Sequence, residues 1–230
     1  MTAGMGGCFI VFEGSEGSGK STQARRLAEW LRGGLGDVVL TREPGGTPLG
    51  ERIRALLLAQ DAYAMLPEAE ALLYAAARAQ HVGDVVRPAL ERSATVVCDR
   101  FVDSSIAYQA GGHGLPLDQV EAIQRLAVGD VRPDLRLLLD LPIGVGLARR
   151  FAAGEEINRI DRAEAAFHER VRRMYLRLAA QEPSQWVVID AARPADTVFD
   201  EVVAAVALRL PELWTVVAAR RQPAAAGGTE

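Results

Sequence analysis

Residues 14–21 read Gly-Ser-Glu-Gly-Ser-Gly-Lys-Ser, and this glycine-rich stretch constrains the fold of the chain more than any other. The apolar run at residues 8–12 before it is typical of a buried strand, and Ala24, Leu27 and Leu31 follow it at helical spacing. Glycines between a strand and a helix let the backbone curl, so that successive N–H groups point inward at the N-terminus of the helix. The sequence therefore predicts a strand–loop–helix unit whose loop holds an anion such as a phosphate group.

Lys20 is the only lysine in the chain, which has 26 lysines and arginines in total. It completes the pattern Gly-x-x-x-x-Gly-Lys-Ser from Gly14 to Ser21, which is the phosphate-binding P-loop. A lysine ammonium is a compact charge on a flexible stem and can follow a phosphate that is being transferred, whereas the planar guanidinium of arginine is bulkier. The hydroxyl after the lysine, here that of Ser21, binds Mg²⁺ in this pattern. The alternative is a chance glycine-rich turn, but the flanking strand and helix and the solitary lysine favour the P-loop.

The composition is that of an ordinary globular protein. With 230 residues, of which 49% are hydrophobic, the chain can form one α/β domain with a large core, or at most two small domains. Its net charge of −4 argues against nonspecific binding of nucleic acid, although local basic patches remain open. Residues 1–7 lack the charged-then-apolar layout of a signal peptide, and no apolar run is long enough to span a bilayer. We therefore expect a cytoplasmic protein that binds neither nucleic acid nor a membrane.

The cysteines and histidines show no spacing typical of a metal site or a catalytic triad. Cys8 and Cys98 fall within predicted buried strands, so we expect both to be reduced thiols in the core. His81, His113 and His168 have no nearby carboxylate in a pattern that suggests catalysis, and we interpret them as structural or surface residues.

Strands and helices alternate along the chain. The predicted strands cover residues 8–12, 37–41, 94–98, 135–141 and 186–190. One helix is predicted after the P-loop and another from Pro116 onward. The other helices are predicted over residues 52–58, 67–90, 104–109, 144–151, 161–180 and 196–210, and the glycines at 111, 112 and 114 are expected to break the one that starts at 104. This alternation predicts an α/β fold, a five-stranded parallel sheet with helices on both faces. No break is rich enough in linker residues to divide it, so residues 1–230 are interpreted as one domain, with a core over 8–210 and a disordered Ala/Gly-rich tail over 220–230.

A carboxylate and an arginine stand at the end of a predicted strand, as Asp99 and Arg100. Ligands of open α/β sheets bind at the carboxyl edge of the strands, where the turn-rich residues 42–47 also lie. Asp99 would hold Mg²⁺ opposite the hydroxyl of the P-loop, and Arg100 would grip a phosphate. A strand-end salt bridge is the alternative, and the P-loop earlier in the chain favours the functional interpretation.

Two further groups of side chains suit a kinase. Arginines at positions 149, 150, 159 and 162 flank residues 152–156, a segment flexible enough to act as a lid over a transferred phosphate. The alternative is a pair of solvent-exposed charged helices, which is the commoner explanation of such a run of charges. Tyr74 and Arg78 lie one helical turn apart, so a ring for stacking and a guanidinium for a base carbonyl would share a face. A core tyrosine beside a surface arginine is the alternative.

Several longer motifs carry a resemblance to a known family. They are Phe-Glu-Gly-Ser-Glu-Gly-Ser-Gly-Lys-Ser-Thr at residues 12–22, Thr-Arg-Glu-Pro-Gly-Gly-Thr at 41–47, Asp-Arg-Phe-Val-Asp-Ser-Ser-Ile-Ala-Tyr-Gln at 99–109, Arg-Pro-Asp-Leu at 132–135 and Arg-Ile-Asp at 159–161. Together they resemble the thymidylate kinase family over about residues 9–210. The motifs at 41–47 and 99–109 are much more specific than a P-loop.

The resemblance implies a P-loop NTPase-type fold with a lid like that of nucleoside monophosphate kinases. It implies transfer of the γ-phosphoryl group of ATP to dTMP, giving dTDP in dTTP biosynthesis, with Mg²⁺ as cofactor. It also implies a homodimer, for which the apolar helices around residues 72–73 and 123–127 are candidate faces; the alternative is that these residues belong to the core. The alternative within this class is a P-loop kinase for another nucleoside monophosphate or for a nucleoside.

A nucleotide-dependent binding switch is the alternative from a different class. A guanine-nucleotide switch reads its base through an Asn-Lys-x-Asp loop, and the chain cannot contain one because its only asparagine, Asn158, precedes Arg159. An ATP-driven switch stays open, and turnover that requires an acceptor nucleotide would exclude a pure switch.

Carried over position by position, the resemblance implies a nucleotide site and a catalytic set. The residues that would bind ATP are Gly14, Ser15, Glu16, Gly17, Ser18, Gly19, Lys20, Ser21 and Thr22, with Ser21 and Asp99 at the metal. The residues that would act on the transferred group are Lys20, Arg100, Arg149, Arg150 and Arg159. The loop interior, Ser15-Glu-Gly-Ser18, has no arginine, so the chain is similar to members that place the catalytic arginine in the lid. Which of the arginines at 149, 150 and 159 reaches the phosphate stays open, because Phe-Ala-Ala at 151–153 replaces the alternating arginines of many such members.

The resemblance also implies an acceptor site. Arg54 and Arg100 would bind the phosphate of dTMP, and Glu16 would approach its 3′-hydroxyl. Tyr74 would lie against thymine and Arg78 would bond a ring carbonyl. The remaining side chains of the pocket would be Ser105, Gln109 and Tyr108, the last of which would crowd the 2′ position of the sugar. The bond between Glu43 and Pro44 would be a candidate cis peptide.

Overall fold

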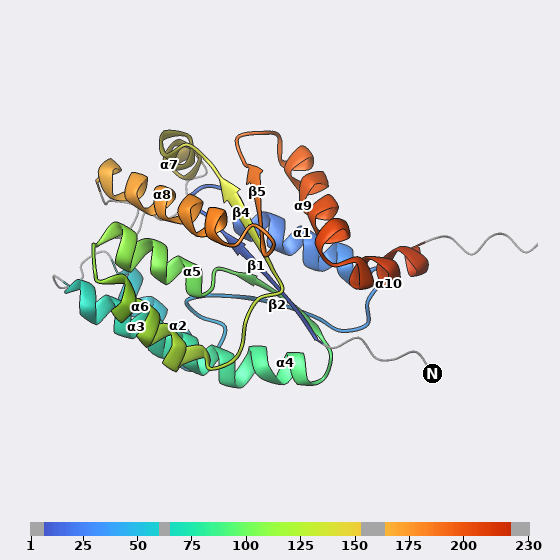
Figure 1. Cartoon of the computed structure of the whole chain (residues 1–230), viewed down its shortest axis with the longest axis horizontal. Helices are drawn as coiled ribbons and strands as arrows, with labels where there is room; N and C mark the ends of the chain where they lie inside the picture. Colours follow the sequence, from blue (N-terminus) through green and yellow to red (C-terminus); the bar gives the residue numbers. More distant parts are fainter. Residues whose placement is uncertain (1–6, 60–64, 153–163, 222–230) are drawn as a thin grey trace, which may run out of the picture.

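The computed structural model describes residues 7–59, 65–152 and 164–221, and its centre is one parallel sheet (Figure 1). The strands are β1 (Cys8–Glu13), β2 (Val38–Arg42), β3 (Thr95–Asp99), β4 (Leu135–Asp140) and β5 (Trp186–Asp190), in the order β2-β3-β1-β4-β5. Every neighbouring pair is parallel, which confirms the predicted fold class, and the predicted strand limits differ from these by at most one residue. The chain fills one side of β1 with β2 and β3 and then the other side with β4 and β5. The topological switch point, where ligands of such sheets bind, therefore lies beside β1.

Alternate residues of β1 belong to two different hydrophobic clusters. Ile10 and Phe12 pack in one cluster with residues of α1 (Lys20–Arg32), α9 (Ala195–Arg209) and α10 (Pro211–Arg221). Phe9 and Val11 pack in the other, with residues of α4 (Arg87–Glu91) and the segment after β3. Because successive side chains of a strand point to opposite faces, this division shows that helices cover both faces of the sheet, as predicted.

The remaining helices lie mostly on the second face and around the carboxyl edge. They are α2 (Pro48–Leu58), α3 (Pro67–His81), α5 (Val102–Ser105), α6 (Leu117–Val128), α7 (Ile143–Ala152) and α8 (Ala165–Gln181). Helix α2 begins four residues before the predicted start at residue 52, because Thr47 accepts a hydrogen bond from the Gly50 N–H and Pro48 occupies the first turn.

The predicted helix at 67–90 is continuous but is not uniform. A π-helical segment, Val82–Val86, joins α3 to α4. Pro88 in the next turn has no N–H to donate, so the regular ladder is interrupted before it, and the Arg87 N–H reaches back to the Val82 carbonyl.

Two glycines that we interpreted as helix breakers are inside a helix. The π-helical segment Ile106–Gly112 follows α5 and includes Gly111 and Gly112. A Cβ atom at Gly111 would lie 2.7 Å from the Met174 Cβ, and one at Gly112 would lie 2.5 Å from the Phe167 ring, both on α8. These glycines allow close packing of two helices, so the predicted break was wrong for this reason.

The C-terminal helix α10 lies beyond the predicted core limit at residue 210. Its Leu213 and Val217 are buried in the cluster with α1 and α9, and the Trp214 ring stacks on Trp30 at 5.7 Å. The predicted tail at 220–230 therefore began too early, since α10 continues to residue 221; the rest of that tail lies outside the described residues.

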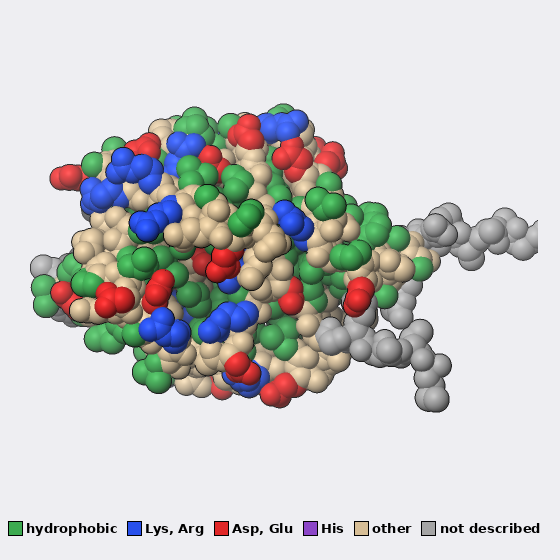
Figure 2. Space-filling model, in the orientation of Figure 1, with side chains coloured by type: hydrophobic (Ala, Val, Ile, Leu, Met, Phe, Trp, Pro, Cys, Tyr) green, Lys and Arg blue, Asp and Glu red, His purple; other side chains and the backbone are tan. Residues whose placement is uncertain are grey.

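In the described ranges, no single helix is long and apolar enough to cross a membrane, and only α9 and α10 taken together, bent by 113°, have the length and composition. On the face shown in Figure 2, the described acidic and basic side chains are interspersed, and they form no continuous basic stripe.

Candidate active site

The loop between β1 and α1 has the backbone that its glycines predict. Gly17 and Gly19 adopt φ of +71° and +87°, in the left-handed region that favours glycine. A Cβ atom at Gly17 would lie 2.0 Å from the carbonyl oxygen of Gly146, so the P-loop packs directly against α7. Residues 14–19 thus turn between the strand and the helix, and α1 begins at Lys20.

Lys20 is buried inside the loop. Its Nζ donates to the Ser15 carbonyl oxygen at 2.6 Å and to the Ser18 Oγ at 3.3 Å. Burial and the nearby Arg100 guanidinium lower the pKa of Lys20 to about 8, in spite of the carboxylates around it. The ammonium is therefore available to exchange these two neutral acceptors for a phosphate.

The predicted metal ligands lie together. The Ser21 hydroxyl donates to Oδ2 of Asp99, the last residue of β3, and Oδ1 of Asp99 is buried with no hydrogen-bond partner among the described residues. An unpartnered carboxylate oxygen beside a hydroxyl suits Mg²⁺, which takes oxygen ligands and usually completes its shell with water and substrate phosphates. In the described part of the chain no three His, Cys, Asp or Glu side chains gather around a common metal position. The residues present fit an ion that is shared with a bound nucleotide.

Arg100 is held in a strained conformation at the centre of the site. Its φ is +74°, which is rare for a residue with a side chain. Its guanidinium donates to the Gly14 carbonyl oxygen and the Glu16 Oε1, both at 3.0 Å, and to the hydroxyls of Tyr175 and Tyr108 at 3.1 and 3.2 Å. These contacts join the P-loop, β3 and α8 around one cation.

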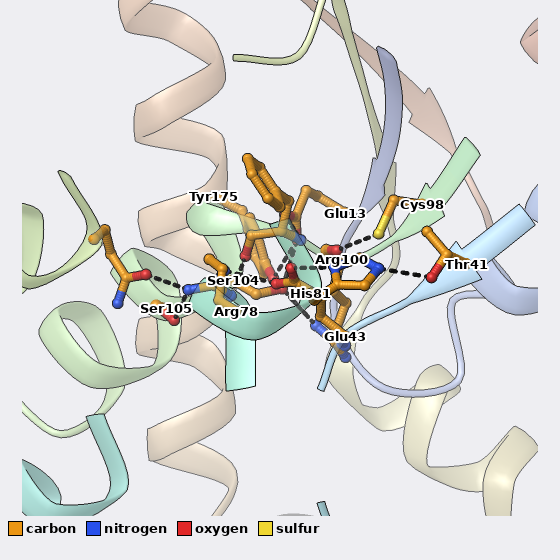
Figure 3. Close-up of polar contacts among 12 residues, drawn as sticks. Glu13, Thr41, Glu43, Arg78, His81, Cys98, Arg100, Ser104, Ser105 and Tyr175 are labelled. Carbon is orange, nitrogen blue, oxygen red and sulfur yellow. Dashed lines mark hydrogen bonds and ion pairs between the residues drawn. The ribbon is translucent and has the colours of Figure 1, made fainter. Parts of the chain in front are cut away.

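Glu13, the last residue of β1, is a buried carboxylate that sequence reasoning did not select. Its Oε1 accepts from the Phe101 N–H at 2.9 Å, and its Oε2 accepts from the hydroxyls of Ser104 and Tyr175 at 2.6 and 3.0 Å (Figure 3). Burial, together with the carboxylate of Asp103, raises the pKa of Glu13 to about 7. The sequence pattern that identified Asp99, a carboxylate at the end of an apolar strand, could also have identified Glu13.

Glu16, at the tip of the P-loop, faces three side chains. It accepts from the Tyr108 hydroxyl at 2.6 Å and from Arg100, and its Oε2 lies 3.6 Å from Nδ1 of the buried His168. Burial by itself would raise the pKa of Glu16, but His168, Arg100 and Lys20 together lower it below the usual range. The carboxylate is thus held ionised beside the cavity.

Arg78 is almost fully enclosed by protein acceptors. Its Nε donates to Oε2 of Glu43 at 2.6 Å, and its Nη1 and Nη2 donate to the Ser105 hydroxyl and the Phe101 carbonyl oxygen, both at 2.7 Å. Nη1 also donates to Oε1 of Gln124. Four of the five N–H groups of the guanidinium therefore have a protein acceptor. Arg78 lies behind Ser105 and does not line the cavity.

Each histidine has a carboxylate partner that is distant in sequence. His81 is buried, with Nδ1 at 2.8 Å from Oε1 of Glu43 and Nε2 at 2.7 Å from the Thr41 hydroxyl (Figure 3). His113 lies 3.1 Å from Glu70, and His168 pairs with Glu16. His81 is therefore a structural residue, because it binds the side chain of Glu43. The peptide bond between Glu43 and Pro44 is cis, which confirms that prediction.

Two predicted arginines contact backbone carbonyl groups at the edge of the site. Arg54 donates to the Pro44 carbonyl oxygen at 3.0 Å. Arg149 donates to the carbonyl oxygens of Ala191 and Ala192 at 2.8 and 3.2 Å, so it joins α7 to the segment after β5. Arg159 and the predicted lid at 152–156, apart from residue 152 at the end of α7, lie outside the described residues.

One cavity of about 360 Å³ joins most of the predicted residues. Those that line it are Glu16, Gly17, Gly19, Lys20, Ser21, Thr22, Arg54, Tyr74, Asp99, Arg100, Ser105, Tyr108, Gln109, Arg149 and Arg150. The lining residues that were not selected as site residues are Arg42, Glu43, Pro44, Leu58 and Ser104. Gly14, Ser15, Ser18 and Arg78 lie outside the lining. The phosphate-binding loop, a tyrosine and a side-chain amide thus line the same cavity.

Comparisons with known proteins identify the family of the chain. The family described as thymidylate kinase matches residues 12–202. The thymidylate kinase of Thermomicrobium roseum is 54% identical over 198 residues, which cover 86% of this chain and 93% of that protein. That of Pseudomonas fluorescens is 52% identical over 190 residues, covering 83% of this chain and 90% of that protein. The crystal structure of thymidylate kinase from Ehrlichia chaffeensis superposes with a TM-score of 0.71 at 35% identity, covering 87% of this chain and 99% of that one. The chain therefore belongs to the thymidylate kinase family, the nucleoside monophosphate kinases that phosphorylate dTMP.

Proposed function

We propose that the chain transfers the γ-phosphoryl group of ATP, with Mg²⁺, to the 5′-phosphate of dTMP, and that the residues of the described cavity carry the reaction. The observation that supports this most is that a single cavity is lined both by Lys20, Ser21 and Asp99 and by Tyr74 and Gln109. Arg100 lines the same cavity. A donor and an acceptor phosphate held in one such site meet without any large displacement.

The donor side uses the P-loop. Its N–H groups and the N-terminus of α1 bind the phosphates of ATP, and Lys20 exchanges its contacts with Ser15 and Ser18 for phosphate oxygens. Ser21 and Asp99 hold Mg²⁺, which when bound neutralises charge on the phosphates.

The chemical step is an in-line displacement. An oxygen of the dTMP phosphate forms a bond to the γ-phosphorus, and the bond from that phosphorus to the bridging oxygen of ADP breaks, leaving dTDP and ADP. The attacking oxygen is already ionised, so no side chain needs to act as a strong base. Arg54 and Arg100 align the acceptor phosphate, while Lys20 and the arginines at 149, 150 and 159 neutralise the moving group.

The acceptor pocket holds the nucleoside. Tyr74 lies against thymine, and Ser105 and Gln109 face its polar edge. Among the described residues, one N–H of Arg78, on Nη2, has no protein acceptor, and it is the group left for a ring carbonyl. Tyr108, which donates to Glu16, crowds the 2′ position, and Glu16 binds the 3′-hydroxyl.

A coupled assay of ADP release tests the proposal directly. ATP and Mg²⁺ are supplied, and dTMP, dUMP, dCMP, dGMP, AMP and thymidine are offered in parallel. Turnover dominated by dTMP supports the proposal. Turnover dominated by another acceptor would keep the P-loop chemistry and overturn the pocket assignment.

A homodimer is part of the proposal. Leu56 on α2, Leu72 on α3 and Leu126 on α6 are exposed by 53, 57 and 89%, and α3 contacts both other helices (Figure 1). Apolar side chains on adjacent helices suit a self-complementary interface. Light scattering after size exclusion should show a dimer that Leu72→Arg or Leu126→Arg converts to monomer. Leu208→Arg on α9, where the leucine is 74% exposed, is the control and should leave the dimer intact.

A cytoplasmic location also belongs to the proposal. The two buried cysteines, Cys8 and Cys98, are free thiols, as is usual where the environment is reducing. Fractionation of cells that produce the tagged chain would test this.

A further inference from the structure

Glu70 is a buried carboxylate that the proposed reaction does not use. It lies in the first turn of α3, and its exposed fraction is 1%. Its Oε1 accepts from Nε2 of Gln109 at 2.9 Å and lies 3.1 Å from Nε2 of His113. Both partners come from the segment after α5, some forty positions further along the chain.

The carboxylate determines which way the Gln109 amide faces. The two ends of an amide differ, because the nitrogen donates and the oxygen accepts. With the amide reversed, Oε1 of Gln109 would face a carboxylate oxygen at hydrogen-bond distance, and two acceptors repel. Glu70 therefore holds the nitrogen of Gln109 toward itself.

The other end of the amide is left for the cavity. Oε1 of Gln109 is buried and has no hydrogen-bond partner among the described residues. Gln109 lines the cavity beside Ser105 and Tyr108, whereas Glu70 lies outside the lining. An unpaired buried acceptor at a binding wall requires a donor on the ligand, because leaving it unpaired is costly.

A thymine or uracil ring supplies such a donor at N3–H, and cytosine does not, because its N3 carries a lone pair. We propose that Glu70 is a positioning residue for base selection: through Nε2 of Gln109 it turns the amide oxygen toward the base, which favours dTMP over dCMP. This inference rests on the proposed function, since it assumes that the cavity binds the base of dTMP. His113 supports Glu70 as a second donor on the same oxygen.

Calorimetric titration of the full chain with dTMP and with dCMP, without ATP, tests the inference. The variant Glu70→Gln can accept from or donate to Gln109, so it permits both orientations of that amide. We expect the ratio of the dCMP to the dTMP dissociation constant to fall by about tenfold or more. Glu68→Gln, at an exposed position in the same helical turn, is the matched control and should leave the ratio unchanged.

The double variant Glu70→Gln with Gln109→Glu provides a rescue. The new amide at position 70 donates to the new carboxylate at position 109, whose second oxygen again offers only an acceptor to the base. We expect the ratio to return to within about threefold of the wild-type value. This variant keeps the volume and charge of the pair, so it carries the test even if Glu70→Gln does not fold.

The outcomes separate the inference from the proposed function. A wild-type chain that does not prefer dTMP over dCMP contradicts the proposed acceptor. A wild-type preference that survives in Glu70→Gln, or a folded double variant that has lost it, contradicts only the role of Glu70. A purely structural role would lower the melting temperature of Glu70→Gln and leave the ratio of dissociation constants unchanged.

Discussion

Arg78 and Glu43 form a buried ion pair, with Nε 2.6 Å from Oε2 and side chains that are 2% and 3% exposed. The pair joins α3 to the loop that follows β2, and His81 binds the second oxygen of the same carboxylate at 2.8 Å. Through Ser105, Arg78 also contacts the pocket that we assign to thymine. A single guanidinium thus connects the stability of the loop at Glu43 with the shape of the acceptor site.

Arg78→Ala should therefore affect both binding and folding. We expect the KM for dTMP to rise much more than the KM for ATP, because Arg78 holds Ser105, a cavity residue that we assign to the acceptor side. We also expect a loss of about 3 kcal/mol in the free energy of unfolding, since Glu43 is left buried without its main cation. Steady-state kinetics and urea titration measure the two effects.

Arg42→Ala is the control for the effect of Arg78→Ala on stability. The Arg42 side chain is 52% exposed and pairs with the 44% exposed Glu51, so its loss should cost less than about 1 kcal/mol. Equal increases in both KM values for Arg78→Ala would mean that Tyr74 and Arg78 do not form the base pocket.

Lys20→Ala should reduce turnover by roughly 10³-fold or more, because it removes the ammonium that lies against Ser15 and Ser18 inside the P-loop. The fold should persist, since the substitution removes only two hydrogen bonds within the loop, and circular dichroism checks this. Near-normal turnover in the variant would contradict the P-loop mechanism. Lys20→Arg tests whether charge suffices, and we expect it to remain strongly impaired because the larger guanidinium does not fit the enclosed loop.

The lowered pKa of Lys20 predicts a pH dependence. Lys20 carries its proton below a pKa of about 8 in the free enzyme and loses it as the pH rises through that value. The ratio kcat/KM for ATP, which reports the free enzyme, should therefore fall about tenfold per pH unit above 8. The ratio kcat/KM for dTMP at saturating ATP should show no break there, because bound phosphates keep Lys20 charged. A flat ATP profile up to pH 10 would contradict the assignment.

Glu13→Gln should change how stability depends on pH. The folded-state pKa of Glu13 is raised from 4.5 to about 7, first by burial and then by Asp103, so the folded chain holds a proton that the unfolded chain has released between these values. The contribution of this group to stability is thus greatest below about pH 4.5 and falls as the pH rises toward 7, by an amount on the order of 3 kcal/mol.

The amide in Glu13→Gln cannot ionise and keeps an oxygen for the Phe101 N–H. We expect the variant to be more stable than the wild type at pH 8 and to lose most of this pH dependence, measured as the free energy of unfolding at pH 5 and 8. An unchanged difference between the two pH values would show that Glu13 is not the group responsible.

Local pattern by itself determined the sheet and the phosphate loop. The strand at Trp186–Asp190 and the loop around Lys20 could be predicted because hydrophobic periodicity and glycine spacing act over a few residues. Asp99 could be placed at the carboxyl edge for the same reason, since parallel strands end on one side of a sheet.

Tertiary structure decided the partners of the buried polar groups. Glu43 meets His81 across 38 positions, Glu70 meets Gln109 across 39, and Glu13 meets Tyr175 across 162. The order in which strands and helices pack brings such groups together, and no local pattern encodes that order. Gly112 illustrates the same limit: its sequence neighbours indicated a break, whereas the Phe167 ring from a distant helix occupies the space that a side chain there would need. A buried carboxylate, amide or guanidinium acquires its role from what surrounds it, because desolvation is tolerated only where a partner compensates for it.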